Sequence, residues 1–143
     1  MSRELKFRVW DKTSDSMLYQ DDFERVELDT KNKMVTLIAE EESDKSHYVL
    51  DYEDGIEAEI LQYTGLKDKN GKEIYEGDIL SIKIYSGDKV IVEGKTVVEF
   101  KDGCFGVIWG HDKAFLSLNS FFKAKFEVIG NIYENPELLR GEK

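Results

Sequence analysis

Short runs in which apolar and polar residues alternate recur along the chain. Residues 5–10 read Leu-Lys-Phe-Arg-Val-Trp, so that Leu5, Phe7 and Val9 occupy alternate positions. A period of two places every second side chain on the same face of a β-strand, and one face of this segment is expected to be buried. The pattern predicts that the fold begins with a strand.

In the N-terminal part of the chain, segments of polar turn-forming residues connect successive apolar runs. Residues 11–16 connect the opening strand to residues 17–20, and residues 29–33 connect residues 25–28 to residues 34–38. Apolar runs joined by such turns are typical of β-hairpins. We therefore expect two hairpins in the N-terminal part of the chain.

The centre of the chain carries the strongest turn signals. Asn70-Gly71 is the dipeptide preferred in a two-residue type I′ hairpin turn, in which both central residues have positive φ. Gly77 predicts a second turn, which leads into a strand beginning at Ile79. Before this centre, residues 47–50 are expected to form a strand, and residues 56–63 either a strand or a short helix.

The C-terminal half consists of short strand-like runs separated by glycines. This spacing predicts a small closed barrel, in which Glu93-Gly94 forms one of the turns. Residues 115–122 fit a strand or a helical turn, and Pro136 is expected to end the last strand and leave a short helical turn and a tail. The predicted strands lie at residues 79–85, 90–92, 95–100, 105–109 and 126–133.

The predicted fold class is therefore mainly β, with two regions. Residues 1–60 form an acidic, β-rich region of hairpins, and this region packs with a C-terminal small barrel, residues 61–143, that ends in a short tail. At 143 residues the chain has the size of one ordinary domain or of two very small β modules sharing a core.

Charged residues are distributed unevenly along the chain. Residues 21–60 hold 14 Asp and Glu against 4 Lys and Arg, whereas the other residues hold 16 of each sign. The acidic run 40–44 is expected to be a solvated loop. An acidic segment repels a phosphate backbone, so a protein partner with a basic surface is favoured over nucleic acid. The alternative is that these residues only solvate an exposed β face.

Cysteine content and hydropathy indicate a compartment. Cys104 is the single cysteine, so no internal disulfide forms, which favours a reducing cytosol. No run of apolar residues has the length of a signal peptide or a membrane helix. We expect a cytoplasmic protein without membrane contact.

Three segments resemble a known family. They read Phe-Arg-Val-Trp-Asp at residues 7–11, Gln-Tyr-Thr-Gly-Leu-Lys-Asp-Lys-Asn-Gly-Lys-Glu-Ile-Tyr-Glu-Gly-Asp at residues 62–78, and Phe-Glu-Val-Ile-Gly-Asn-Ile-Tyr-Glu-Asn-Pro-Glu-Leu at residues 126–138. Together they resemble the YopX family of phage and prophage proteins over nearly the whole chain, although residues 21–54 depart from the family pattern. The resemblance implies a phage or prophage gene, and hence the cytoplasm of a bacterial host cell. It also implies an SH3-like barrel in the C-terminal half and no assigned enzymatic activity, and it supplies no catalytic residues.

No catalytic, cofactor or metal motif is present, and we expect neither an enzyme nor a cofactor. A dyad of Cys104 and His111 is conceivable, but a core cysteine and a loop histidine explain the same residues. His47 is the other histidine, and two histidines with one cysteine do not make a zinc set. Asp68 starts a segment that partly resembles a calcium loop but lacks the remaining ligands, so it is interpreted as turn chemistry.

Aromatic residues supply the candidate interaction surface. Trp10, Tyr63, Tyr75 and Trp109 could line a groove, as aromatics do in peptide-binding SH3 domains. The alternative is that they fill the core or a subunit interface. The favoured function is a non-enzymatic phage accessory protein, a self-associating β-barrel module that binds a host or phage protein. The alternatives are a small-barrel nucleic-acid-binding protein and a toxin-type endoribonuclease.

Overall fold

The computed structural model describes residues 4–41 and 44–140 and divides the chain into two compact units. One unit comprises Leu5–Gln62, and the other begins at Tyr63. The chain passes from the first to the second within strand β6, Ala58–Lys67. Each unit has its own hydrophobic core, and the two are described separately below.

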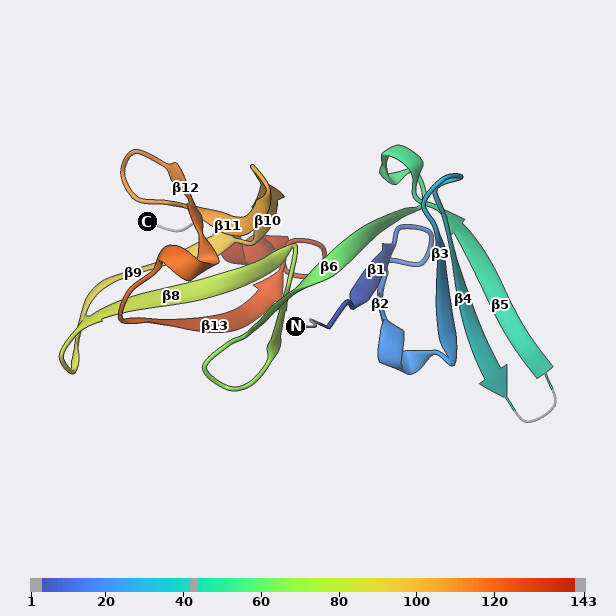
Figure 1. Cartoon of the computed structure of the whole chain (residues 1–143), viewed down its shortest axis with the longest axis horizontal. Coiled ribbons are helices and arrows are strands. Elements are labelled where there is room, and N and C mark those ends of the chain that lie inside the picture. Colours follow the sequence, from blue (N-terminus) through green and yellow to red (C-terminus); the bar gives the residue numbers. More distant parts are fainter. Residues whose placement is uncertain (1–3, 42–43, 141–143) are drawn as a thin grey trace. The chain divides into compact units, whose positions relative to one another are not determined.

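The unit Leu5–Gln62 is built from two antiparallel sheets (Figure 1). Both predicted hairpins are present, and residues 58–63 belong to a strand rather than a helix. The first sheet has the order β2 (Ser16–Tyr19), β1 (Phe7–Asp11), β6, and the second has the order β3 (Arg25–Asp29), β4 (Met34–Glu41), β5 (Asp44–Asp51). Two short 3-10 helices, η1 (Gln20–Asp22) and η2 (Glu53–Gly55), connect the strands.

The core of this unit draws side chains from both sheets. Its buried members are Val9, Val35, Leu37, Leu50 and Ala58. Val35 and Leu37 occupy alternate positions of β4, as the period of two predicts, and each such side chain stabilises the fold by about 1.5–3 kcal/mol on burial.

The acidic loop predicted at residues 40–44 is shorter than expected. Strand β4 continues through Glu41, and β5 begins at Asp44, with these two residues paired across the hairpin. The remainder of the predicted loop, Glu42 and Ser43, lies outside the described residues.

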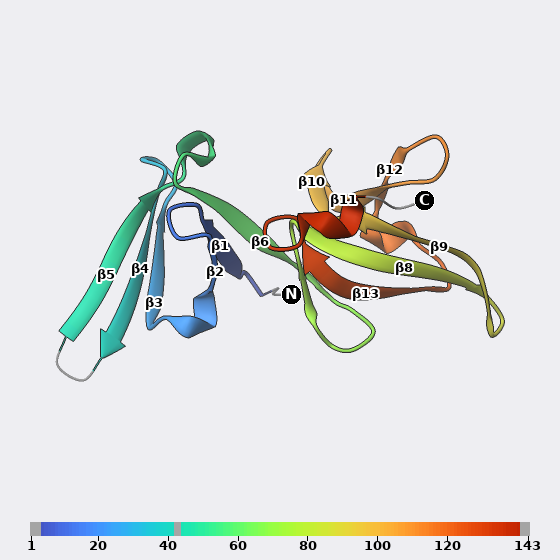
Figure 2. The same ribbon diagram turned by 180° about the vertical axis from the view of Figure 1, so that it is seen from behind.

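The unit that begins at Tyr63 contains the C-terminal strands. Its sheets have the orders β13-β8-β9 and β10-β11-β12, and β7 pairs with the end of β6. In Figures 1 and 2, β10, β11 and β12 lie over one face of the β13-β8-β9 sheet. The elements are β7 (Glu73–Tyr75), β8 (Asp78–Ser86), β9 (Lys89–Val97), β10 (Glu99–Lys101), β11 (Cys104–Trp109), β12 (Ala114–Ser117), η3 (Leu118–Ser120), β13 (Ala124–Asn131) and η4 (Pro136–Leu139).

Between these two sheets lies the second core. Leu80 and Ile82 of β8 face Val107 of β11 and Leu118 of η3, and all four are buried. Because the strands curl around this core, the unit has the form of a partly open barrel. The predicted fold class, mainly β, is confirmed.

The turn at Asn70-Gly71 differs from the predicted type I′ turn. Gly71 has φ +84°, but Asn70 is not among the residues with positive φ. The backbone N–H of Asp68 donates to the Lys72 carbonyl at 2.8 Å, so three residues rather than two form the connection. The Asp68 carboxylate organises it by accepting hydrogen bonds from the backbone N–H groups of Asn70 and Lys72 at 2.8 and 2.9 Å.

The same carboxylate also reaches β13. Its second oxygen accepts a hydrogen bond from the backbone N–H of Val128, 60 residues away, at 2.9 Å. Burial raises the pKa of Asp68, but the N–H donors of Val128, Lys72 and Asn70 together outweigh it, and the pKa lies below its usual value. Asp68 therefore ties the central turn to the barrel.

Gly94 lies inside a strand, so the predicted turn at Glu93-Gly94 is wrong. Strand β9 continues through both residues to Val97. A Cβ atom at position 94 would lie 3.2 and 3.3 Å from two carbons of the Trp109 ring. Glycine is therefore needed here for a close approach of the indole rather than for a turn.

We predict that Asp68→Asn destabilises the protein. Asp68 accepts backbone hydrogen bonds on both carboxylate oxygens. Asparagine has only one side-chain oxygen, so in either orientation of the amide its NH₂ group faces a backbone N–H donor and that hydrogen bond is lost. The free energy of unfolding, measured by urea denaturation near neutral pH, should fall by about 1–3 kcal/mol. Asp88→Asn at the exposed β8–β9 turn is the control, with an expected change within about 0.5 kcal/mol.

Acid should remove this difference. A carboxylate whose folded pKa is lowered stabilises the fold above the unfolded pKa of about 3.9 and loses that contribution as the pH falls through the folded pKa. The gap between the wild type and Asp68→Asn should thus shrink below about pH 4. A gap that stays constant or widens on acidification would contradict this role of Asp68.

Candidate functional site

Three of the four predicted surface aromatics are buried. Trp10 in β1 is 8% exposed, and Tyr63 and Tyr75 are 5% and 4% exposed. Tyr63 of β6 and Tyr75 of β7 are brought together as cross-strand neighbours, with ring centroids 5.6 Å apart. Trp109 is only partly buried and packs edge-on against Phe121, with centroids 5.6 Å apart. Of the four, Trp109 is the one that reaches solvent.

Trp109 lies beside an open groove of about 530 Å³. One wall consists of residues 92–95 of β9, and the other consists of residues 108–111 and Lys113, at the end of β11 and in the turn that follows. The Thr96 hydroxyl donates to the Ile108 carbonyl at 2.8 Å and ties the two strands together next to the groove.

Strand β9 is an edge strand of its sheet and pairs in that sheet with β8. Its first five residues, 89–93, are all exposed. Three of them are aliphatic: Val90, Ile91 and Val92 are 37%, 56% and 45% exposed. Val90 lies opposite Tyr85 of β8, and Val92 lies opposite the preceding residue, Ile84, so β9 contains a bulge between them. Because consecutive residues of β8 point to opposite faces, Val90 and Val92 also lie on opposite faces of the sheet.

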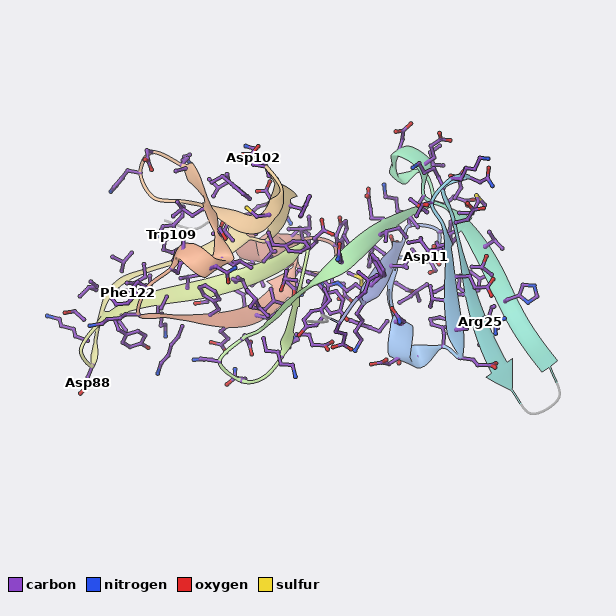
Figure 3. The ribbon with its side chains drawn as sticks, in the orientation of Figure 1. Asp11, Arg25, Asp88, Asp102, Trp109 and Phe122 are labelled. Carbon is purple, nitrogen blue, oxygen red and sulfur yellow. The ribbon has the colours of Figure 1, made fainter. Side chains whose placement is uncertain are left out.

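Sequence reasoning missed this edge. Three consecutive aliphatic residues do not alternate, and such a run is usually taken as a strand buried on both faces. One signal of an exposed edge was present in the sequence. The charged residues Lys89 and Glu93 stand on either side of the aliphatic run, immediately after the Gly87-Asp88 turn. Figure 3 labels Asp88 at the tip of this hairpin.

A second surface feature gathers lysines around aromatic rings near the same hairpin. Lys125 of β13 pairs across the sheet with Lys83 of β8, and the Lys125 Nζ lies 5.1 Å from the centroid of the Tyr85 ring. Lys123 lies over the ring of Phe122, which is 77% exposed. A shallow hollow of about 410 Å³ is lined by Tyr85, Lys123 and Lys125, with the acidic Asp88 also on its wall. Anionic ligands would be attracted to this cluster.

The conceivable Cys104–His111 dyad does not form. Cys104 begins β11, and His111 follows its end, so a strand of about 17 Å, at about 3.3 Å per residue, separates the two. The Cys104 thiol donates instead to the Lys101 carbonyl at 3.6 Å. His47 is exposed on β5 in the other unit.

Among residues 4–41 and 44–140, no group of three His, Cys, Asp or Glu side chains is placed to hold a metal ion. Asp68, the first residue of the calcium-like segment, already accepts three backbone hydrogen bonds. In the same described part of the chain, no helix is long and apolar enough to cross a membrane.

We predict that Gly94→Val displaces the indole of Trp109. A side chain at position 94 must enter the space within 3.3 Å of the ring, so Trp109 moves toward the groove. The tryptophan fluorescence should shift, and the free energy of unfolding should fall by about 1–3 kcal/mol. Glu93→Ala, at the preceding exposed position, is the control and should leave the emission unchanged. An unaltered spectrum in Gly94→Val would show that Trp109 does not rest on β9.

Comparison with known proteins places this geometry in a family. The chain is 31% identical to protein EF1440 from Enterococcus faecalis, with a TM-score of 0.61 over 96% of this chain and 99% of that one. It is 26% identical to protein yopX from Bacillus subtilis, with a TM-score of 0.70 over 94% and 97% of the two chains. A search of curated proteins gives no match. The model of the YopX protein family matches residues 6–140, and the chain therefore belongs to the YopX family.

Proposed function

We propose that the chain is a non-enzymatic phage or prophage accessory protein that acts in the bacterial cytoplasm as a self-associating β interaction module. The observation that carries the proposal is the open edge of β9, where residues 89–93 are exposed and three of them are aliphatic. Unpaired N–H and C=O groups along a sheet edge are a template for another strand. The groove beside Trp109 offers space for side chains of an added strand.

Charge supports a second partner, a host or phage protein with a basic surface. The unit Leu5–Gln62 contains 16 acidic and 7 basic side chains, a net charge of −9, whereas the rest of the chain is close to neutral. Such a field accelerates encounters with a basic surface and disfavours acidic ones. The separation of Cys104 from His111 is the support for a non-enzymatic role.

Light scattering over a range of protein concentrations tests self-association. We expect a mass that rises from 16.6 kDa toward at least twice that value as the concentration increases, because edge pairing obeys mass action. A mass that remains at 16.6 kDa at every concentration would contradict self-association.

A matched pair of variants tests the basic partner in the same preparation. Proteins captured from host lysate should be released by high salt and lost with Asp22→Lys combined with Asp54→Lys, two exposed acidic positions of the acidic unit. Asp88→Lys combined with Glu99→Lys makes the same charge change in the other unit and should retain them. Capture that is indifferent to all these charges would contradict the basic partner.

The cluster of Lys83, Lys123 and Lys125 favours one alternative function, binding of single-stranded nucleic acid. Proteins of that class combine a cationic track with aromatic faces on which bases stack. Tyr85 and the exposed Phe122 are such faces, and both have lysine ammonium groups within 6 Å of the ring centroid.

Oligonucleotide binding measured by fluorescence anisotropy at two salt concentrations tests this alternative. If it holds, Lys83→Ala combined with Lys125→Ala should weaken binding by more than tenfold and flatten its salt dependence. Lys31→Ala combined with Lys33→Ala, at an exposed turn of the acidic unit, is the control. An absence of binding at low salt would eliminate the alternative.

A further inference from the structure

The acidic unit contains an apolar pocket of about 160 Å³ between its two sheets. Val9 of β1 and Val35 of β4, which are 2% and 0% exposed, are the most buried residues of its lining and belong to the core of the unit. Leu5, which is 57% exposed, also lines it. The pocket therefore leads from solvent to the core.

Strand β3 presents an apolar face to this pocket. Val26 and Leu28 line it and are half-buried. Arg25, labelled in Figure 3, and Glu27 occupy the alternate positions, which point to the opposite face of the strand. There the Arg25 Nε lies 2.7 Å from a Glu27 carboxylate oxygen. The charges of β3 are thus paired with each other on the far side from the pocket.

Gln20, the first residue of η1, brings a polar group to the lining. Its Oε1 accepts a hydrogen bond from the backbone N–H of Phe7 at 3.1 Å, and this contact fixes the orientation of the amide. The Gln20 Nε2 donates no hydrogen bond within the described part of the chain. This NH₂ group can therefore donate to a main-chain carbonyl of an occupant.

Negative charge follows directly after Gln20. Asp21 and Asp22 of η1 are both exposed. Asp21 lies 3.1 Å from the Lys6 Nζ, whereas Asp22 forms no ion pair within residues 4–41 and 44–140. The unit as a whole has a net charge of −9. This field favours an occupant that joins an apolar group to a cation.

Volume and charge together select among the possible occupants. A cavity of about 150 Å³ lined by aliphatic and aromatic side chains takes up a molecule of the size of benzene, so this pocket has room for one large apolar side chain. A neutral apolar molecule would match the volume but not the charge. A second copy of the acidic unit would bring like charge toward Asp22. A basic segment of another protein matches both properties.

We propose that this pocket receives one large apolar side chain, a phenylalanine or a leucine, from a lysine-rich or arginine-rich segment of another protein. The inference rests on the basic partner proposed above and assigns the place where that partner is anchored. The apolar side chain contacts Val9 and Val35, the main chain accepts from Gln20, and a flanking cation lies near Asp22.

Labelled peptides test the occupant by fluorescence anisotropy with the wild-type protein. The probe is Gly-Lys-Lys-Phe-Lys-Lys-Gly. Replacing its phenylalanine by alanine should raise the dissociation constant by about tenfold or more, because the buried ring is lost. Replacing its four lysines by glutamates should abolish measurable binding at low salt. This comparison does not depend on the folding of any variant.

Two protein variants with matched controls test the place of binding. Val26→Phe fills the pocket from its wall and should weaken binding of the probe by about tenfold or more. Val49→Phe, the same change at an exposed position of β5, should have no effect. Asp22→Lys should weaken binding at low salt by about threefold or more. Asp15→Lys, in the turn at the opposite end of the β1–β2 hairpin, should change it less.

The outcomes separate this inference from the proposed function. Salt-sensitive capture of host proteins that Val26→Phe leaves unchanged overturns the pocket and leaves the basic partner in place. Equal binding of the phenylalanine and alanine peptides overturns the apolar anchor. Binding that survives replacement of the lysines assigns the pocket to a neutral apolar ligand instead, and a wild-type dimer that Val26→Phe dissociates assigns it to a second copy. Capture that is indifferent to charge, with no peptide binding, overturns both proposals.

Discussion

The contact between Trp109 and Gly94 determines how much of β9 is covered. The indole rests so close to the backbone that a Cβ atom at position 94 would lie 3.2 Å from the ring, and the Thr96 hydroxyl donates to the Ile108 carbonyl next to it. These contacts fasten the second half of β9 to β11. The first half extends beyond them with every residue exposed, and the groove and the open edge both result from this arrangement.

Polar side chains in this fold mainly organise turns. Asp68 uses both carboxylate oxygens to hold backbone N–H groups of the central turn and of β13. Asp11 does the same locally, where it accepts hydrogen bonds from Thr13 and Ser14. Burial raises the pKa of Asp11, but these donors outweigh burial and leave its pKa below the usual value. The carboxylates with lowered pKa values thus have structural partners.

Local patterns predicted the strands well, because the period of two is imposed by burial of one face. The hairpin at residues 25–38 follows that rule, and the structure reproduces it. The opening strand forms as predicted but not with one buried face, because Leu5 is exposed, and Arg8 and Trp10 are buried like Val9 between them. The turn at Asn70-Gly71 was located correctly, but its geometry depends on Val128, a residue distant in sequence, through Asp68. The local sequence predicts a turn at Gly94 because the ring that requires this glycine comes from another strand.

The candidate site was harder to predict than the fold. Aromatic residues indicate either a core or a surface, and only packing distinguishes the two: Tyr63 and Tyr75 are buried, whereas Trp109 borders a groove. The exposure of Val90, Ile91 and Val92 depends on where β11 ends its contact with β9, which no local pattern contains.

Amide hydrogen exchange along β9, compared between dilute and concentrated solutions, tests the central claim most directly. If the open edge pairs with a second copy, amides within residues 90–93 should exchange rapidly in dilute solution and become protected as the concentration rises, while those of β8 remain protected throughout. Exchange at residues 90–93 that is independent of concentration would contradict an edge that associates with itself.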